Sequence, residues 1–75
     1  MKIAAIVGNN IRRYRKAAGL SLMACEERSG VTRSQINTIE HGRSNAALLT
    51  LSYIAEACGV TVAKLFIEPR GRKCK

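Results

Sequence analysis

The sequence predicts an all-α domain built from five short helices. Glycines divide the chain into segments of helical length, and they stand at Gly19, Gly30, Gly42 and Gly59. Within these segments apolar residues recur at steps of three and four, which is the spacing of one helix face, and no segment alternates with period two for long enough to form a strand. At 75 residues the chain is expected to hold one core, because two smaller cores would each bury too little surface.

The first helix is expected over residues 3–18, and Gly19 ends it with a left-handed cap. Its apolar face consists of residues spaced four and three apart: Ile3, Val7, Ile11 and Tyr14. Ser21 belongs to the residue types that cap helix starts, so a short second helix is expected from there to about residue 28.

Thr32 is expected to cap a third helix over residues 33–40. A fourth helix is expected near residues 47–58, where one apolar stripe comprises Leu48, Leu51, Ile54, Ala55 and Cys58. Thr61 is expected to cap the last short helix, which ends near Phe66.

These helices are expected to form one domain over residues 1–68, followed by a basic tail over residues 69–75. Pro69 stops the last helix and nothing beyond it can be buried, so the tail is expected to be disordered. The opening residues resemble a signal peptide, but their apolar run is too short for one. No stretch is long and apolar enough to span a membrane. We therefore expect a cytoplasmic protein without a membrane partner.

The charge balance and the missing residue types exclude most chemistry. Thirteen Lys and Arg stand against five acidic residues, all Glu, and the formal charge is +8. Without Asp there is neither a Ser-His-Asp triad nor an EF-hand loop, and a single His excludes a multi-His metal site. Cys25, Cys58 and Cys74 are too far apart for a C-x-x-C site, so the first two are expected to be small buried hydrophobes. We expect no enzyme, cofactor, metal or small-molecule ligand, and an anionic partner.

The middle of the chain predicts a helix-turn-helix, because two short helices are joined there by a tight turn at residues 29–31. In such a motif the second helix can lie in the major groove of DNA. Its inner face is expected to be Val31, Ile36 and Ile39. Its outward residues are all polar and include no acid: Arg33, Ser34, Gln35, Asn37 and Thr38. Each of these can donate or accept a hydrogen bond at a base edge.

A longer pattern covers residues 7–66. It comprises Gly8, Ile11-Arg12, Arg15 and Gly19-Leu20-Ser21, then Ser29-Gly30-Val31-Thr32-Arg33-Ser34, Ile36, Ile39-Glu40 and Gly42-Arg43, then Thr50-Leu51, Ile54-Ala55, Ala57 and Gly59-Val60. In this combination the chain resembles the Cro/C1-type (XRE) helix-turn-helix family. The resemblance implies a compact, lambda-repressor-like fold of five helices that binds double-stranded operator DNA as a two-fold homodimer.

The resemblance also implies which residues touch DNA. Base contacts are implied for Arg33, Ser34, Gln35 and Thr38, of which Gln35 lies near the groove edge and touches a base or a phosphate. Phosphate contacts are implied for Ser21, Asn37, His41, Arg43 and Ser44.

Two further features are implied away from the bases. Arg15 and Glu40 match a structural ion pair between the first helix and the end of the third. The dimer interface matches the last helix and the segment before it: Val60, Val62, Leu65 and Phe66. One of the last two is expected to point inward and the other to stay partly uncovered.

The second helix departs from the family pattern at two positions. Leu22 replaces a Gln that contacts the DNA backbone, so that contact is absent or is supplied by Ser21 or a neighbour. Cys25-Glu26 replaces a Leu-Ala pair at the centre of the helix. Either the helix is rotated so that Leu22 or Met23 turns inward, or Glu26 pairs with a cation such as Arg12 or Arg13.

The function predicted first is a sequence-specific DNA-binding transcriptional regulator, a repressor that binds a two-fold operator as a homodimer. The alternative is an antitoxin or another module whose main task is to bind a partner protein. Such a module needs an exposed apolar surface, for which the candidates are Leu22, Met23, Leu49 and Tyr53.

Overall fold

The computed structural model describes residues 2–43 and 46–67, which form four α-helices and one short 3₁₀ helix. In chain order these are α1 (Lys2–Ala17), α2 (Leu22–Ser29), α3 (Arg33–Glu40), α4 (Leu48–Cys58) and η1 (Val62–Phe66). The all-α prediction is confirmed. The predicted tail, residues 69–75, lies outside the described residues. Among the described residues no helix is long and apolar enough to cross a membrane.

The predicted count of five α-helices is wrong, because the last element is a 3₁₀ helix of 5 residues. Its backbone bonds span three residues, from Lys64 N to Thr61 O and from Ile67 N to Lys64 O. The 3₁₀ form is used in short pieces, and this element is near the upper end of their usual length. Thr61 precedes the element as expected, but its side chain makes no capping hydrogen bond.

The predicted starts and ends of the first three helices are confirmed to within one residue. Ser21 Oγ accepts a hydrogen bond from Ala24 N at 3.0 Å, and Thr32 Oγ1 accepts one from Gln35 N at 3.2 Å. Each serves a backbone N–H that has no partner inside its own helix. Gly30 ends α2 with a φ of 80°, which glycine adopts without strain.

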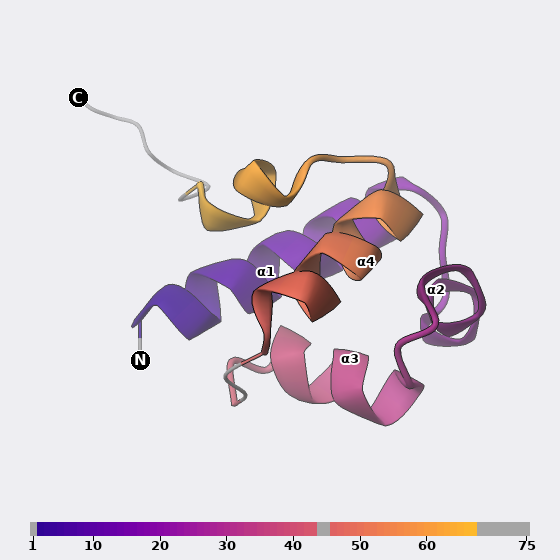
Figure 1. Ribbon diagram of the computed structural model, residues 1–75, viewed down its shortest axis with the longest axis horizontal. Helices are drawn as coiled ribbons and strands as arrows, with labels where there is room; N and C mark the ends of the chain where they lie inside the picture. The colour runs from indigo at the N-terminus through magenta and orange to yellow at the C-terminus, as the bar shows by residue number, and fades with distance from the viewer. Residues whose placement is uncertain (1, 44–45, 68–75) are drawn as a thin grey trace.

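The helices are arranged around α1 and α4, which lie side by side (Figure 1). Helix α3 packs on one side of this pair and η1 on the other, and both contact α1. Helix α2 closes one end of the molecule and contacts α3 and α4. This arrangement leaves the far side of α3 uncovered.

One core lies between all five elements. Its largest fully buried apolar side chains are Ile11, Ile36, Ile54 and Leu65. Cys25 of α2 and Cys58 of α4 are buried in it as free thiols, so the prediction that they pack as small hydrophobes is confirmed. The hydrogen bond with Cys25, together with burial, raises the pKa of Cys58, so this thiol stays protonated.

Helix α1 approaches the end of α3 closely at Gly8. A Cβ at this position would overlap the carbonyl oxygen of Ile39 and lie 2.8 Å from that of Glu40. Only glycine fits here, although glycine inside a helix costs about 1 kcal/mol relative to alanine. The contact fixes how far α3 stands from the body of the domain.

Candidate nucleic-acid interface

Helices α2 and α3 cross steeply, since Figure 1 shows α2 nearly end-on and α3 from the side. Ile36 and Ile39 of α3 and Val31 of the turn are buried, as predicted for the inner face. The opposite side of α3 is exposed at Arg33, Ser34, Gln35 and Asn37, and Thr38 is half-buried beside them. The structure therefore brings the candidate base-contacting residues together on one open helix face.

The structure restricts the hydrogen bonds that Thr38 can make to a base. Its hydroxyl donates a hydrogen bond to the carbonyl oxygen of Ser34 at 2.9 Å, one turn earlier in α3. The single hydroxyl hydrogen is thereby used, and Oγ1 keeps lone pairs that accept. In this pose Thr38 suits an exposed base amino group or the methyl group of thymine.

Arg33 begins α3 and pairs with Glu26 of α2, with 3.2 Å between Nε and Oε1. Glu26 therefore has a cation partner, which is one of the two alternatives left open, but the partner is neither of the examples Arg12 and Arg13. Arg13 instead donates to Asn10 Oδ1 and lies over the Tyr14 ring at 5.0 Å. The reason is topological, because the steep crossing turns the Glu26 side of α2 toward the start of α3 rather than toward α1.

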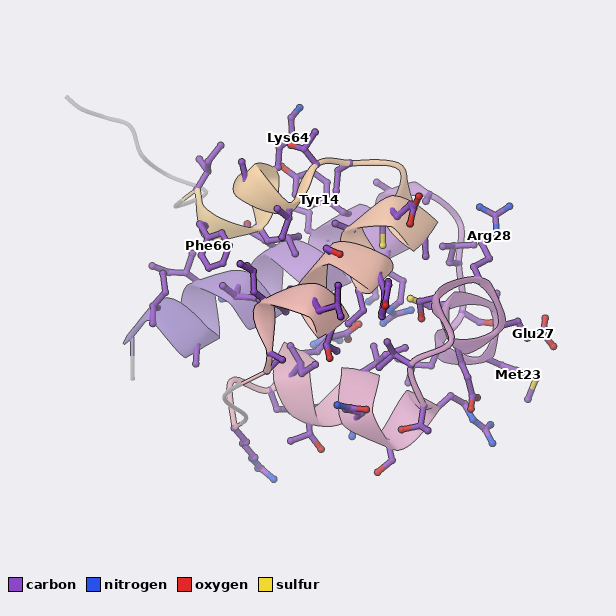
Figure 2. All side chains as sticks on the ribbon, viewed as in Figure 1. Tyr14, Met23, Glu27, Arg28, Lys64 and Phe66 are labelled. Atoms are coloured by element: carbon purple, nitrogen blue, oxygen red, sulfur yellow. The ribbon has the colours of Figure 1, made fainter. Side chains whose placement is uncertain are left out.

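The rest of α2 matches one of the alternatives left open by the sequence. Leu22 is half-buried and packs against the core, whereas Met23 is exposed. Figure 2 shows Met23 and Glu27 projecting from α2 away from the body of the domain. Leu22 thus contributes apolar packing at a position where the family pattern has a polar residue.

The candidate phosphate contacts flank this face. Ser21 is exposed at the start of α2, and because its Oγ accepts from Ala24 N, its hydroxyl hydrogen stays available to an anion. Asn37, His41 and Arg43 are exposed at the end of α3 and just beyond it. Ser44 lies outside the described residues.

His41 is tied to its own helix end. Its ring Nδ1 lies 2.8 Å from the carbonyl oxygen of Asn37, which can only accept, so this contact requires the hydrogen on Nδ1. Nε2 then carries a lone pair in the neutral ring and donates to phosphate only when the ring is protonated.

Arg15 and Glu40 form the ion pair beneath this surface. Arg15 Nε lies 2.7 Å from Glu40 Oε2, and Nη2 donates to Oε1 at 3.1 Å. Arg15 Nη1 also donates to the carbonyl oxygen of Leu20 at 2.9 Å, so one guanidinium joins α1, α3 and the loop before α2. The hydrogen bond with Glu40 raises the pKa of Arg15, so the guanidinium stays charged.

The candidate dimer residues divide between core and surface. Leu65 is fully buried and closes the core, whereas Phe66 is 38% exposed, so one does point inward and the other is partly uncovered. Val60 and Val62 are half-buried against the core. Phe66 borders an open cleft of about 100 Å³ whose other walls are Ile3, Ala4, Val7, Ile39, Ala46 and Leu51. Figure 2 shows Phe66 pointing from η1 toward α1.

Residues 6–65 match the family model described as a helix-turn-helix domain. The match covers most of the chain and includes α2, the turn and α3. The chain belongs to the Cro/C1-type helix-turn-helix family.

Relatives of this family are named as regulators. The uncharacterized HTH-type transcriptional regulator y4dJ of Sinorhizobium fredii is 35% identical over 65 residues, which cover 87% of this chain and 84% of that protein. The control protein C.SmaI of Serratia marcescens is 37% identical over 65 residues, which cover 87% and 77%. The restriction-modification controller protein C.AhdI of Aeromonas hydrophila superposes with a TM-score of 0.83 at 29% identity, over 88% of this chain and all of that one. This helix-turn-helix protein is a DNA-binding transcriptional regulator.

Asn10 is a structural residue that sequence reasoning missed. It is fully buried, and its Nδ2 donates to the carbonyl oxygens of Leu65 and Ile67, both at 2.7 Å. It therefore holds η1 against α1. The available signal was its position: Asn10 follows Val7 by three residues, within the apolar stripe of α1, where a polar side chain needs buried partners.

Proposed function

We propose that this protein is a repressor that binds a two-fold operator as a homodimer and reads each half-site with α3. The observation that carries the proposal is the open face of α3, where exposed polar side chains stand together and none is acidic. A face of this kind can enter the negative potential of a major groove without repulsion.

Arg33 carries the main base contact in this proposal. Its side chain is 55% exposed, and a guanidinium matches the O6 and N7 acceptors of guanine. Ser34 and Gln35 reach neighbouring base edges, and Thr38 supplies an acceptor or a methyl contact. Ser21, Asn37 and Arg43, together with Ser44 and the protonated form of His41, hold the flanking phosphates and fix the register of α3.

We propose a dimer because a single helix-turn-helix motif can contact only one half of a two-fold operator. One α3 covers about one half-site, and two half-sites on one face of DNA are centred roughly 34–36 Å apart. We place the interface at Phe66, supported by Val60 and Val62, because Phe66 is partly exposed beside an open apolar cleft. Leu65 supports this surface from within the core. Repression then follows from occupancy, since a dimer bound across a promoter excludes other proteins from it.

Selection from a pool of random duplexes with the purified protein tests this proposal. The expected result is one enriched motif with two-fold symmetry, and a guanine that loses its enrichment when Arg33→Ala is selected in parallel. Placing that motif in a promoter upstream of a reporter then gives the sign of regulation. A motif without symmetry would overturn the homodimer, and increased reporter output would overturn repression.

A second candidate function, partner binding, is favoured by the outer side of α4. Leu48 and Leu49 are 65% and 62% exposed there, and Tyr53 lies beside them. If this surface serves an antitoxin-like module, the pure chain should fail to shift any specific duplex without the partner. A specific shift by the pure chain would make DNA binding primary.

A further inference from the structure

One carboxylate stands at the edge of the proposed DNA-reading surface. Glu26 is an acid at the position where the family pattern has a small residue, and its closest cation is Arg33. An acid beside DNA repels phosphate, so its presence there needs a reason. We propose that Glu26 is a positioning residue: it holds Arg33 for a base and makes binding more selective for guanine. The proposal rests on the base contact assigned to Arg33 under the proposed function.

The contact geometry leaves the reading edge of Arg33 open. The closest approach is 3.2 Å between Arg33 Nε and Glu26 Oε1, so the carboxylate lies at the Nε edge of the guanidinium. A guanidinium has five N–H donors in a rigid plane, and four of them are on Nη1 and Nη2. These donors remain for the O6 and N7 acceptors of guanine, which a bidentate arginine contacts.

The ion pair also changes how much Arg33 contributes to sequence-independent DNA binding. A free arginine contributes to binding on any sequence, because it neutralises a phosphate and releases a counterion. Arg33 beside Glu26 already has a counter-charge, so it gains less from phosphate. A guanine edge differs from a phosphate because it offers two acceptors aligned with the guanidinium. Glu26 is therefore expected to lower affinity for random DNA and to raise the ratio between guanine and other bases.

Stability does not explain the pair. The side chains of Arg33 and Glu26 are 55% and 36% exposed, and exposed ion pairs contribute little to folding. Glu26→Ala removes the carboxylate from a helix and introduces the best helix former, so the variant is expected to fold. Any change in base discrimination then reports on Arg33 and not on the fold.

Helix α2 supplies a matched control in Glu27. It is exposed, is next to Glu26 in sequence, and makes no ion pair among the residues that the structure describes. Figure 2 shows it pointing away from the domain. Glu27→Ala changes the net charge by the same amount as Glu26→Ala without touching Arg33, so it separates charge from positioning.

The experiment measures equilibrium affinity of the full chain for three duplexes at one salt concentration. These are the selected operator, the same operator with adenine in place of the guanine assigned to Arg33, and a random duplex. Wild type is compared with Glu26→Ala, Glu26→Gln, Glu27→Ala, Arg33→Ala and the double variant Glu26→Ala/Arg33→Ala. Circular dichroism checks that each variant is folded.

Both alanine variants of the acids are expected to bind random duplex more tightly. Only Glu26→Ala is expected to lower the guanine-to-adenine affinity ratio, by about fivefold, in the range of couplings between contacting residues. Glu26→Gln, which keeps an acceptor but no charge, should fall between wild type and Glu26→Ala. In the Arg33→Ala background the Glu26 substitution should leave the ratio unchanged.

The outcomes separate this inference from the function beneath it. If Glu26→Ala keeps the wild-type ratio while Arg33→Ala abolishes it, Arg33 reads guanine and the positioning role of Glu26 is wrong. If Arg33→Ala keeps the wild-type guanine-to-adenine affinity ratio, Arg33 does not contact that guanine, and both the base contact and the positioning role of Glu26 are wrong. An equal loss of ratio in Glu26→Ala and Glu27→Ala would mean that general charge acts, which also overturns positioning.

Discussion

The protein pairs arginine with glutamate in two regions, and the two pairs differ in almost every physical respect. Arg15 and Glu40 meet at the junction of α1 and α3, where their side chains are 10% and 5% exposed. Arg33 and Glu26 meet at the outer edge between α3 and α2, in contact with solvent. The inner pair shares two contacts and a further hydrogen bond to Leu20, whereas the outer pair has one longer contact.

The difference shows that burial decides what such a pair can do. A buried charge that loses its partner stays desolvated, so each member of the inner pair holds the other in place and with it the position of α3. In the outer pair, water replaces the partner at little cost, so the pair cannot hold a helix. It can still bias the pose of one side chain. The same residue types thus fix the fold in one region and, under our proposal, position a base-contacting arginine in the other.

The largest effect is expected from Glu40→Gln, which breaks the inner pair and leaves Arg15 buried without a counter-charge. Breaking a buried pair from one side costs about 3–5 kcal/mol, a large part of the stability of a small domain. Thermal melting followed by circular dichroism measures the loss. The control is Glu26→Gln, the same substitution in the outer pair, which should melt close to wild type. Equal melting temperatures for the two variants would remove the distinction between the pairs.

Gly8→Ala is expected to disturb the same junction sterically. The new methyl group would overlap the backbone of Ile39 and Glu40, which no rotamer change can relieve. Overpacking typically costs about 1–3 kcal/mol, partly offset here by the better helix propensity of alanine. The control is Asn9→Ala, at the next position of α1, whose side chain is exposed. Urea unfolding should show a loss for Gly8→Ala alone; a stabilised Gly8→Ala variant would contradict the close approach.

The sequence predicted the helices of the domain better than the contacts between them. Helix bounds follow from local chemistry: Ser21 and Thr32 cap helix starts, and Gly30 takes the left-handed conformation that ends α2. The 3₁₀ form of η1 was missed, because five residues carry too little periodic pattern to distinguish it from an α-helix.

Contacts between helices could not be predicted from neighbouring residues in the sequence, for a different reason. Asn10 bonds to Leu65, 55 residues away, and nothing near either residue specifies that partner. A cation partner for Glu26 was one of two alternatives that the sequence left open, and the crossing of α2 and α3 makes that partner Arg33. Arg15 and Glu40 were paired correctly only because a family pattern implied it.

In the outer region, Arg33→Ala is expected to weaken operator binding without changing stability. Losing a bidentate contact to guanine costs about 1–3 kcal/mol of discrimination. Thr38→Ala should cost less, because its hydroxyl is already bonded to Ser34 and offers only lone pairs. Affinity titrations on operator and random duplex measure both, with melting temperature as the control. Operator affinity equal to wild type for Arg33→Ala would remove this residue from the readout.

The smallest effect is expected at a third surface, which neither ion pair touches. Phe66→Glu should weaken the homodimer, because it places a charge where the proposed interface needs apolar area. Only 38% of Phe66 remains exposed in the protomer, so the area that dimerisation can still cover is a fraction of the side chain. Full burial of such a side chain contributes about 1.5–3 kcal/mol, so the exposed fraction corresponds to about 0.6–1 kcal/mol for each copy of Phe66. A two-fold interface contains two copies, so the loss is about 1–2 kcal/mol per dimer, or roughly tenfold in the dimer dissociation constant.

Sedimentation over a range of protein concentrations measures that shift. Ala63→Glu is the charge-matched control, since Ala63 is exposed on the same 3₁₀ helix and does not border the cleft beside Phe66. Operator affinity should fall with the dimer in Phe66→Glu, while binding of a single half-site should not change, because α3 and its arginine are untouched. A folded Phe66→Glu variant that dimerises like wild type would move the interface to Leu49 and Tyr53 on the outer side of α4, which are exposed as well.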